Sequence, residues 1–186
     1  MHRPGLVFCF ALATLAAPLA AAAQSLANLP PRKPGMWELR MVTEKPAGGP
    51  TIDAKICIDA ATDRELMNFG LRMSKDTCKR YDMKKQGQAW VIDAECTFGP
   101  VSSATKTTIS GDFQSTMNVR IEGTTEGIPG VGKGPQQTLM TQTGRWAGAA
   151  CTGGMVPGDI AMANGLKFNV KDIKGLQKLL PGLQIR

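Results

Sequence analysis

The cysteines constrain this chain more than any other feature. Five occur in the 186 residues, and Cys9 lies in an N-terminal segment with the three parts of a secretory signal: basic Arg3, an apolar run over 6–19, and small residues. We expect cleavage of residues 1–23 as a signal peptide, because the apolar run is shorter than the about 20 residues that span a bilayer. Four cysteines then remain, and an even number in an exported chain favours disulfides over metal or catalytic thiols.

The pattern between residues 78 and 98 predicts a β-hairpin and, with it, the disulfide pairing. Apolar and polar residues alternate on both sides of Gly87, which supplies the positive φ that a tight turn often needs. If the hairpin is centred on Gly87, Cys78 and Cys96 face each other within reach of a disulfide. Exclusion then pairs Cys57 with Cys151, and closing so long a loop is worth about 4 to 5 kcal/mol in the chain-entropy model.

Alternation of period two predicts further strands, over 37–43, 51–58, 105–113, 117–123 and 137–146. Thr62 and Glu65 match a capping box, which predicts one short helix between the second and third strands, with Leu66, Phe69 and Met73 as its buried stripe. The fold class expected is therefore mainly β. It is an antiparallel meander of about six to seven strands, a curled sheet or a barrel, with one short inserted helix and a C-terminal helical tail.

The composition changes after Cys151 and divides the chain into three parts. Asn169 is placed to cap a helix over 170–180 that has one apolar side, while Lys167, Lys171, Lys174 and Lys178 gather on the other. We expect a signal peptide over 1–23, a β domain with two disulfides over 24–152, and a helical basic tail over 153–186. A basic amphipathic helix can lie on an anionic membrane, or it can pack on or beside its own domain.

Several short motifs resemble an exported bacterial family. They are Pro34-Gly35-Met36-Trp37-Glu38, Cys57-Ile58-Asp59, Gly111-Asp112-Phe113, and Gly144-Arg145-Trp146-Ala147-Gly148 with Cys151. In this order, beside a signal peptide, they are similar to the family classified as domain of unknown function 3617, over roughly residues 33–151. The resemblance implies a periplasmic or secreted protein and carries no activity.

Gly35-Met36-Trp37 and Arg145 also resemble lipocalins, in which an arginine packs across a tryptophan ring at the closed end of a barrel. This likeness makes Trp37, Trp90, Arg145 and Trp146 candidates for a ligand pocket or a barrel closure. The alternative is that Trp37 and Trp146 are ordinary core aromatics.

Composition narrows the possible functions. The only histidine, His2, lies in the signal peptide, which excludes Ser-His, Cys-His and imidazole metal chemistry from the cleaved chain. We expect a noncatalytic envelope protein without cofactor or metal that binds a small apolar or amphipathic ligand. An alternative is a surface protein that binds an anionic membrane, polysaccharide or protein through basic patches, with Lys84, Lys85, Lys171, Lys174 and Lys178 as candidates. A hydrolase using two carboxylates is the third alternative, and no specific nucleic-acid site is expected.

Overall fold

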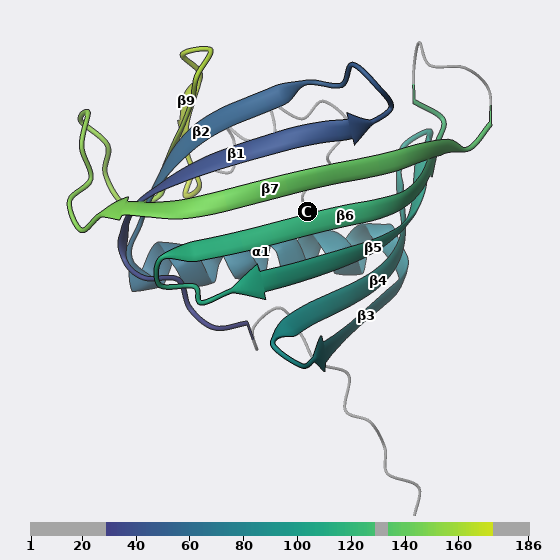
Figure 1. Ribbon diagram of the computed structural model, residues 1–186, viewed down its shortest axis with the longest axis horizontal. Helices are drawn as coiled ribbons and strands as arrows, with labels where there is room; N and C mark the ends of the chain where they lie inside the picture. Colours follow the sequence, from purple (N-terminus) through teal and green to yellow (C-terminus); the bar gives the residue numbers. More distant parts are fainter. Residues whose placement is uncertain (1–28, 129–133, 173–186) are drawn as a thin grey trace, which may run out of the picture.

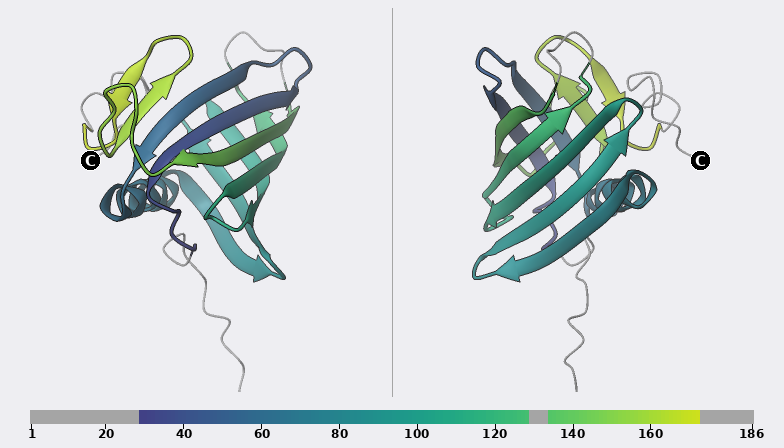
Figure 2. Two further views of the ribbon diagram at one scale, coloured as in Figure 1. Left: turned by 60° about the vertical axis from the view of Figure 1, so that its left-hand side comes forward. Right: turned by 90° about the vertical axis from the view of Figure 1, so that its right-hand side faces the viewer.

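One antiparallel sheet dominates the molecule. The computed structural model describes residues 29–128 and 134–172, and in this part nine strands pair in the order β3-β4-β5-β6-β7-β1-β2-β8-β9. Their bounds are β1 Gly35–Lys45, β2 Thr51–Ile58, β3 Cys78–Gln86, β4 Ala89–Phe98, β5 Val101–Gly111, β6 Thr116–Glu126, β7 Gln136–Gly148, β8 Asp159–Met162 and β9 Lys167–Asn169. The sheet curls around one long helix, α1 (Ala60–Thr77), which lies against its concave side (Figures 1 and 2).

The sheet curls without closing. β3 and β9 lie at its two ends and do not pair with each other, so of the two predicted forms the curled sheet is correct and the barrel is wrong. The prediction of six to seven strands falls short by the hairpin of β8 and β9, which extends the sheet beyond β2.

Alternation of side chains builds the core on the concave face. Across β1 and β2, Trp37 lies opposite Ile56, and both are buried together with Met83, Ile92 and other apolar residues of the same face. Charged residues of the opposite parity, such as Glu38 and Lys55, are exposed on the outer face, whereas Met36 and Cys57 of that parity are buried in a second, smaller cluster. The expected alternation of β2, with its isoleucines on one face, is thus confirmed.

The hairpin of β3 and β4 has the predicted disulfide in a different register. Most of its pairs, such as Lys85 opposite Trp90, are shifted by one residue from a hairpin centred on Gly87. An irregularity between Cys78 and Arg80 restores the offset, so Cys78 still lies opposite Cys96 and is bonded to it. The Cys57–Cys151 disulfide is also present.

The N-cap of helix α1 lies three residues before the predicted one. Asp59 is the N-cap: its carboxylate accepts a hydrogen bond from the Thr62 amide at 2.7 Å, and the Thr62 hydroxyl accepts one from the Asp59 amide at 2.8 Å. The predicted Thr62–Glu65 box was therefore wrong, because β2 ends directly before Asp59 and leaves it extended. The helix is long rather than short, and the stripe of Leu66, Phe69 and Met73 is only half-buried.

The tail predicted as a helix is different where the structure describes it. Residues 153–172 form turns and the short strands β8 and β9, and Asp159 holds them together by accepting from the Val156 amide and the Asn169 side chain, both at 2.9 Å. The Asn169 side-chain oxygen accepts from the Lys171 amide at 3.0 Å, and residues 170 and 171 form a turn. The remainder of the predicted helix, with Lys174 and Lys178, lies outside the described residues.

Candidate ligand-binding recess

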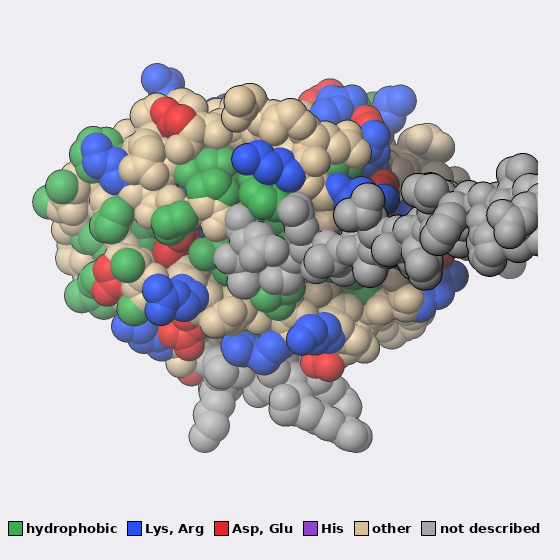
Figure 3. Space-filling view, turned by 90° about the horizontal axis from the view of Figure 1, so that it is seen from below, with side chains coloured by type: hydrophobic (Ala, Val, Ile, Leu, Met, Phe, Trp, Pro, Cys, Tyr) green, Lys and Arg blue, Asp and Glu red, His purple; other side chains and the backbone are tan. Residues whose placement is uncertain are grey.

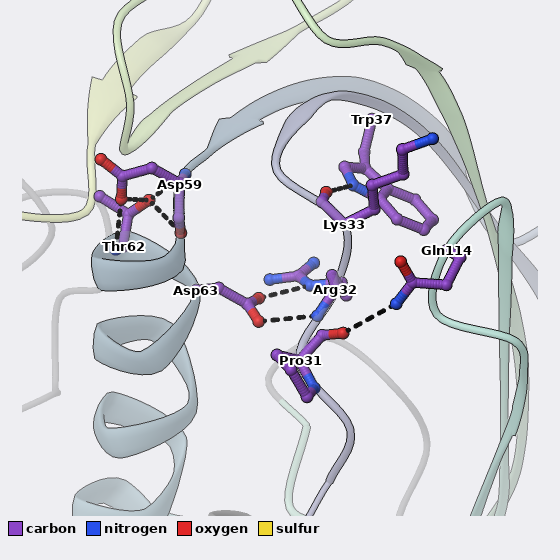
Figure 4. Close-up of polar contacts among 8 residues, drawn as sticks. All are labelled: Pro31, Arg32, Lys33, Trp37, Asp59, Thr62, Asp63 and Gln114. Carbon is purple, nitrogen blue, oxygen red and sulfur yellow. Dashed lines mark hydrogen bonds and ion pairs between the residues drawn. The ribbon is translucent and has the colours of Figure 1, made fainter.

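Two tryptophan side chains hold a short segment before β1 in place. The Trp37 indole donates to the Lys33 carbonyl at 2.8 Å, and the Trp146 indole donates to the Pro34 carbonyl at 3.0 Å. The Lys33 amide donates to the Phe113 carbonyl at 2.9 Å. We call residues 29–34 the lead segment; Figure 4 shows how it runs between α1 and the loop that carries Gln114.

An ion pair joins the lead segment to α1. The Arg32 guanidinium lies 2.7 Å from the Asp63 carboxylate, which also accepts from the Arg32 amide at 3.0 Å (Figure 4). The Asp63 side chain is 2 % exposed and that of Arg32 is 13 % exposed. Because both groups are largely withdrawn from water, each depends on the other for its polar contacts.

The loop between β5 and β6 brings an aromatic side chain to the same place. Phe113 has φ 58°, a conformation uncommon for a residue other than glycine, and its side chain is buried. The preceding Asp112 carboxylate stabilises the loop by accepting from the Ser115 hydroxyl and from the amides of Gln114, Ser115 and Thr116. These hydrogen bonds, that of the Ser115 hydroxyl foremost, hold the pKa of Asp112 far below its usual range.

These three parts enclose an apolar recess of about 210 Å³. Its walls come from the lead segment, α1 and the concave side of β5 and β6, and they include Leu66, Met67, Ile109, Phe113, Met117 and Val119. Arg32 and Asp63 form its polar border. Figure 3 views the molecule from below, where apolar side chains gather in patches bordered by Lys and Arg side chains.

The four residues predicted for a pocket or barrel closure lie apart from this recess. Trp37 and Trp90 are buried in the core, and Trp146 packs against it. Arg145 lies on the outer face, opposite Glu38 in β1, and does not cross a tryptophan ring. The cation that does so is Lys33, whose ammonium lies 3.6 Å from the centre of the Trp146 ring.

The basic residues predicted for surface binding are scattered. Lys84 and Lys85 lie on the edge strand β3, and the Lys85 ammonium is 5.7 Å from the centre of the Trp90 ring. Lys171 follows β9 at the other end of the sheet order. Two other cations of β3, Lys79 and Arg80, both form ion pairs with Glu95, at 2.8 and 3.4 Å.

Burial perturbs one other ionisable group near the core. Tyr81 packs against the core cluster from β3, and burial raises its pKa to about 12 because the phenolate is poorly solvated there.

Within the described ranges, no group of three or more acidic, cysteine or histidine residues is arranged to hold a metal ion. The same ranges contain no helix with the length and apolarity required to span a membrane.

The comparisons with known proteins identify a family. The family model "Protein of unknown function (DUF3617)" matches residues 32–151. The chain belongs to this family. No curated protein and no solved structure matches it. The resemblance to lipocalins gains no support from these comparisons.

In this DUF3617 protein, the motifs that carried the resemblance are structural contacts around the lead segment. Gly35 has φ 125°, and a Cβ there would collide with the Gly148 carbonyl, so the missing side chain of Gly35 lets β1 and β7 approach closely. Asp112 and Phe113 form the loop that the Lys33 amide contacts.

Sequence reasoning missed the lead segment, because it has neither periodicity nor a charge run. The one available signal was that the family resemblance begins there.

Proposed function

We propose that this protein is an exported, noncatalytic binding protein of the cell envelope that holds the apolar end of an amphipathic ligand in the recess between α1, β5 and β6. The observation that carries the proposal is the recess itself, whose lining is apolar apart from the Arg32–Asp63 border. Ligand pockets are typically apolar with a few placed polar groups, which is the composition found here. The two disulfides support an oxidising compartment, such as the periplasm or the exterior.

The size of the recess defines what part of a ligand it holds. Pockets that enclose a whole drug-sized molecule measure about 300–1,000 Å³, and this one, at about 210 Å³, is smaller. A dry apolar cavity of about 150 Å³ already binds benzene. The recess therefore suits an acyl or aromatic end, with the polar end of the ligand outside, beside Arg32.

A pair of variants on one helix tests this function. Met67 lines the recess and Met73 does not, although both are half-buried residues of α1. Met67→Trp fills the recess with a larger side chain and should weaken binding of the neutral probe phenylnaphthylamine at least about tenfold, whereas Met73→Trp should change it less than about twofold. Equal affinities in the two folded variants would refute the assignment of the recess.

The alternative of a basic interaction surface has less support. Two cations on the same strand as Lys84 and Lys85, namely Lys79 and Arg80, pair with Glu95. The lowered pKa of Glu95, caused first by its hydrogen bond from Lys79, reflects the same pairing. Binding to vesicles of anionic lipid that disappears at high salt would favour this alternative, since exposed charges are screened beyond about 10 Å at 0.1 M salt.

A further inference from the structure

The outer face of the sheet carries an ordered row of charges across three strands. Arg145 of β7 lies opposite Glu38 of β1, which lies opposite Lys55 of β2. Lys55 lies opposite Ala161 of β8, so an apolar residue follows these three charges in the row. These side chains belong to the face opposite the core, since they alternate with Trp37 and Ile56 along β1 and β2.

A second row lies beside the first. Thr143 of β7 is opposite Arg40 of β1, which is opposite Asp53 of β2. Arg40 is therefore the diagonal neighbour of Arg145, a spacing of about 7–8 Å that long side chains bridge. The Ala163 amide donates to the Asp53 carbonyl at 2.9 Å, which places residues 161–163 along the same side of the row.

The two rows line a groove of about 610 Å³. Both the strand residues of the rows and residues 161–163 contribute to its walls. This volume falls within the about 300–1,000 Å³ of small-molecule sites, unlike the recess on the other face. The groove thus has space for a complete small ligand, with an apolar wall and a set of fixed charges.

The charges of the groove do not cancel. Lys55 pairs with Glu38 at 3.1 Å and Arg40 contacts Asp53 at 3.4 Å, with about half of each side chain exposed. Such exposed pairs are worth about 0–1 kcal/mol, so a ligand can replace them easily. The Arg145 guanidinium has no carboxylate partner among the residues that the structure describes. Three cations therefore face two carboxylates, and the excess positive charge is on Arg145.

We propose that this groove is a second binding site, for a small organic anion with an apolar body. The anionic end contacts Arg145 and its neighbour Arg40, because a guanidinium donates two parallel hydrogen bonds to a carboxylate, sulfonate or phosphate group. The apolar body lies against Ala161, Met162 and Ala163. The site does not depend on the recess of the proposed function, since the two lie on opposite faces of the sheet.

The test uses anilinonaphthalenesulfonate, a probe with one sulfonate and an apolar ring system, titrated into the folded protein. Arg145→Gln should raise its Kd at least about tenfold, as expected for the loss of hydrogen bonds to a charged group. Arg120→Gln is the matched control, because Arg120 is also an exposed outer-face arginine but lies on β6 beside Glu122. Its Kd should change less than about twofold, and the wild-type Kd should rise with salt more steeply than that of Arg145→Gln.

Two further measurements separate this site from the recess. Met67→Trp, which fills the recess, should leave sulfonate binding unchanged, and the Ala161 and Ala163 amide resonances should shift when the probe is added. Glu38→Gln removes a carboxylate from the groove and should tighten binding. If Arg145→Gln binds the probe like the wild type, or if Met67→Trp abolishes binding, the groove is not the site and the proposal is wrong.

Discussion

The ion pair between Arg32 and Asp63 makes the sharpest prediction about what holds the lead segment in place. We consider Arg32→Gln, Asp63→Asn and the double variant. Each single change leaves one charged group without its partner in a place where little water reaches: the side chains are 13 % and 2 % exposed. Asp63→Asn also weakens the acceptor of the Arg32 amide, 3.0 Å away.

The expected magnitude follows from that burial. Removing one member of a buried pair costs about 3–5 kcal/mol, because the other is left as an uncompensated charge. The partial exposure of Arg32 places both single variants near the lower limit, about 3 kcal/mol. For a domain of this size, a loss of 3 kcal/mol lowers the Tm by about 6–12 °C. The double variant buries no charge, so it should be less destabilised than the two single changes together, with a coupling of about 1–3 kcal/mol.

Urea unfolding followed by tryptophan fluorescence measures all four proteins. With an m-value of about 1–3 kcal/mol/M, the single variants should lose about 1–3 M in midpoint. The single variants should also release phenylnaphthylamine faster, because the lead segment forms one wall of the recess. Single changes that cost less than about 0.5 kcal/mol, or that add fully in the double variant, would refute the reasoning.

Three other predictions concern pH and covalent bonds. Because the pKa of Asp112 is lowered in the folded state, the stability that this carboxylate contributes is present above its ordinary pKa of 3.8 and is lost as the pH falls below that value. The Tm of Asp112→Asn, measured by calorimetry, should therefore fall less steeply with acid than the Tm of the wild type. Tyr81 is the only tyrosine, and its ultraviolet titration should have a midpoint near pH 12 in the folded protein. Because the phenol of the unfolded chain ionises near pH 10, the stability of the folded protein should fall as the pH rises above 10. A midpoint at pH 10 in the folded protein would contradict the burial of Tyr81. Replacing Cys57 and Cys151 by alanine should cost about 1–2 kcal/mol more in urea unfolding than replacing Cys78 and Cys96, because the bonds span 94 and 18 residues; the reverse order would show that the chain-entropy account fails here.

Local pattern was enough to find most of the sheet. Period-two alternation identified β1 to β7, because one face of each strand packs on the core while the other meets water. The hairpin disulfide was predicted correctly although the register was off by one, since an irregularity after Cys78 compensates for the shift. That irregularity lies at the junction of α1 and β3, and rules that relate turn type to hairpin register do not describe such a junction.

The missed features are those that tertiary contacts create. β8 has four residues and β9 three, too few for a recognisable alternation, and they form because the edge of β2 offers β8 partners such as Ala54 and Ile56. The predicted start of α1 was three residues too late, because two pairs of residues can form a capping box here, Asp59 with Thr62 and Thr62 with Glu65. The position at which β2 ends selects the first pair. The lead segment depends on groups that are distant from it in sequence, such as the Trp146 indole, 112 residues after Pro34, and the Asp63 carboxylate, 31 residues after Arg32.

The position of β1 in the sheet has a consequence for how the chain assembles during synthesis. Of the strands in the described part of the chain, β1 is made first, yet it lies between β7 and β2, with Trp37 opposite both Trp146 and Ile56. The ribbon from β3 to β7 and the pair of β1 and β2 each form between neighbours in sequence, whereas the pairing of β1 with β7 must wait for β7, about 100 residues later. During that interval Cys78 and Cys96 are available to Cys57 before its native partner Cys151 is made. Oxidation that runs ahead of synthesis therefore favours wrong pairs, and correct maturation requires either slow oxidation or an isomerase.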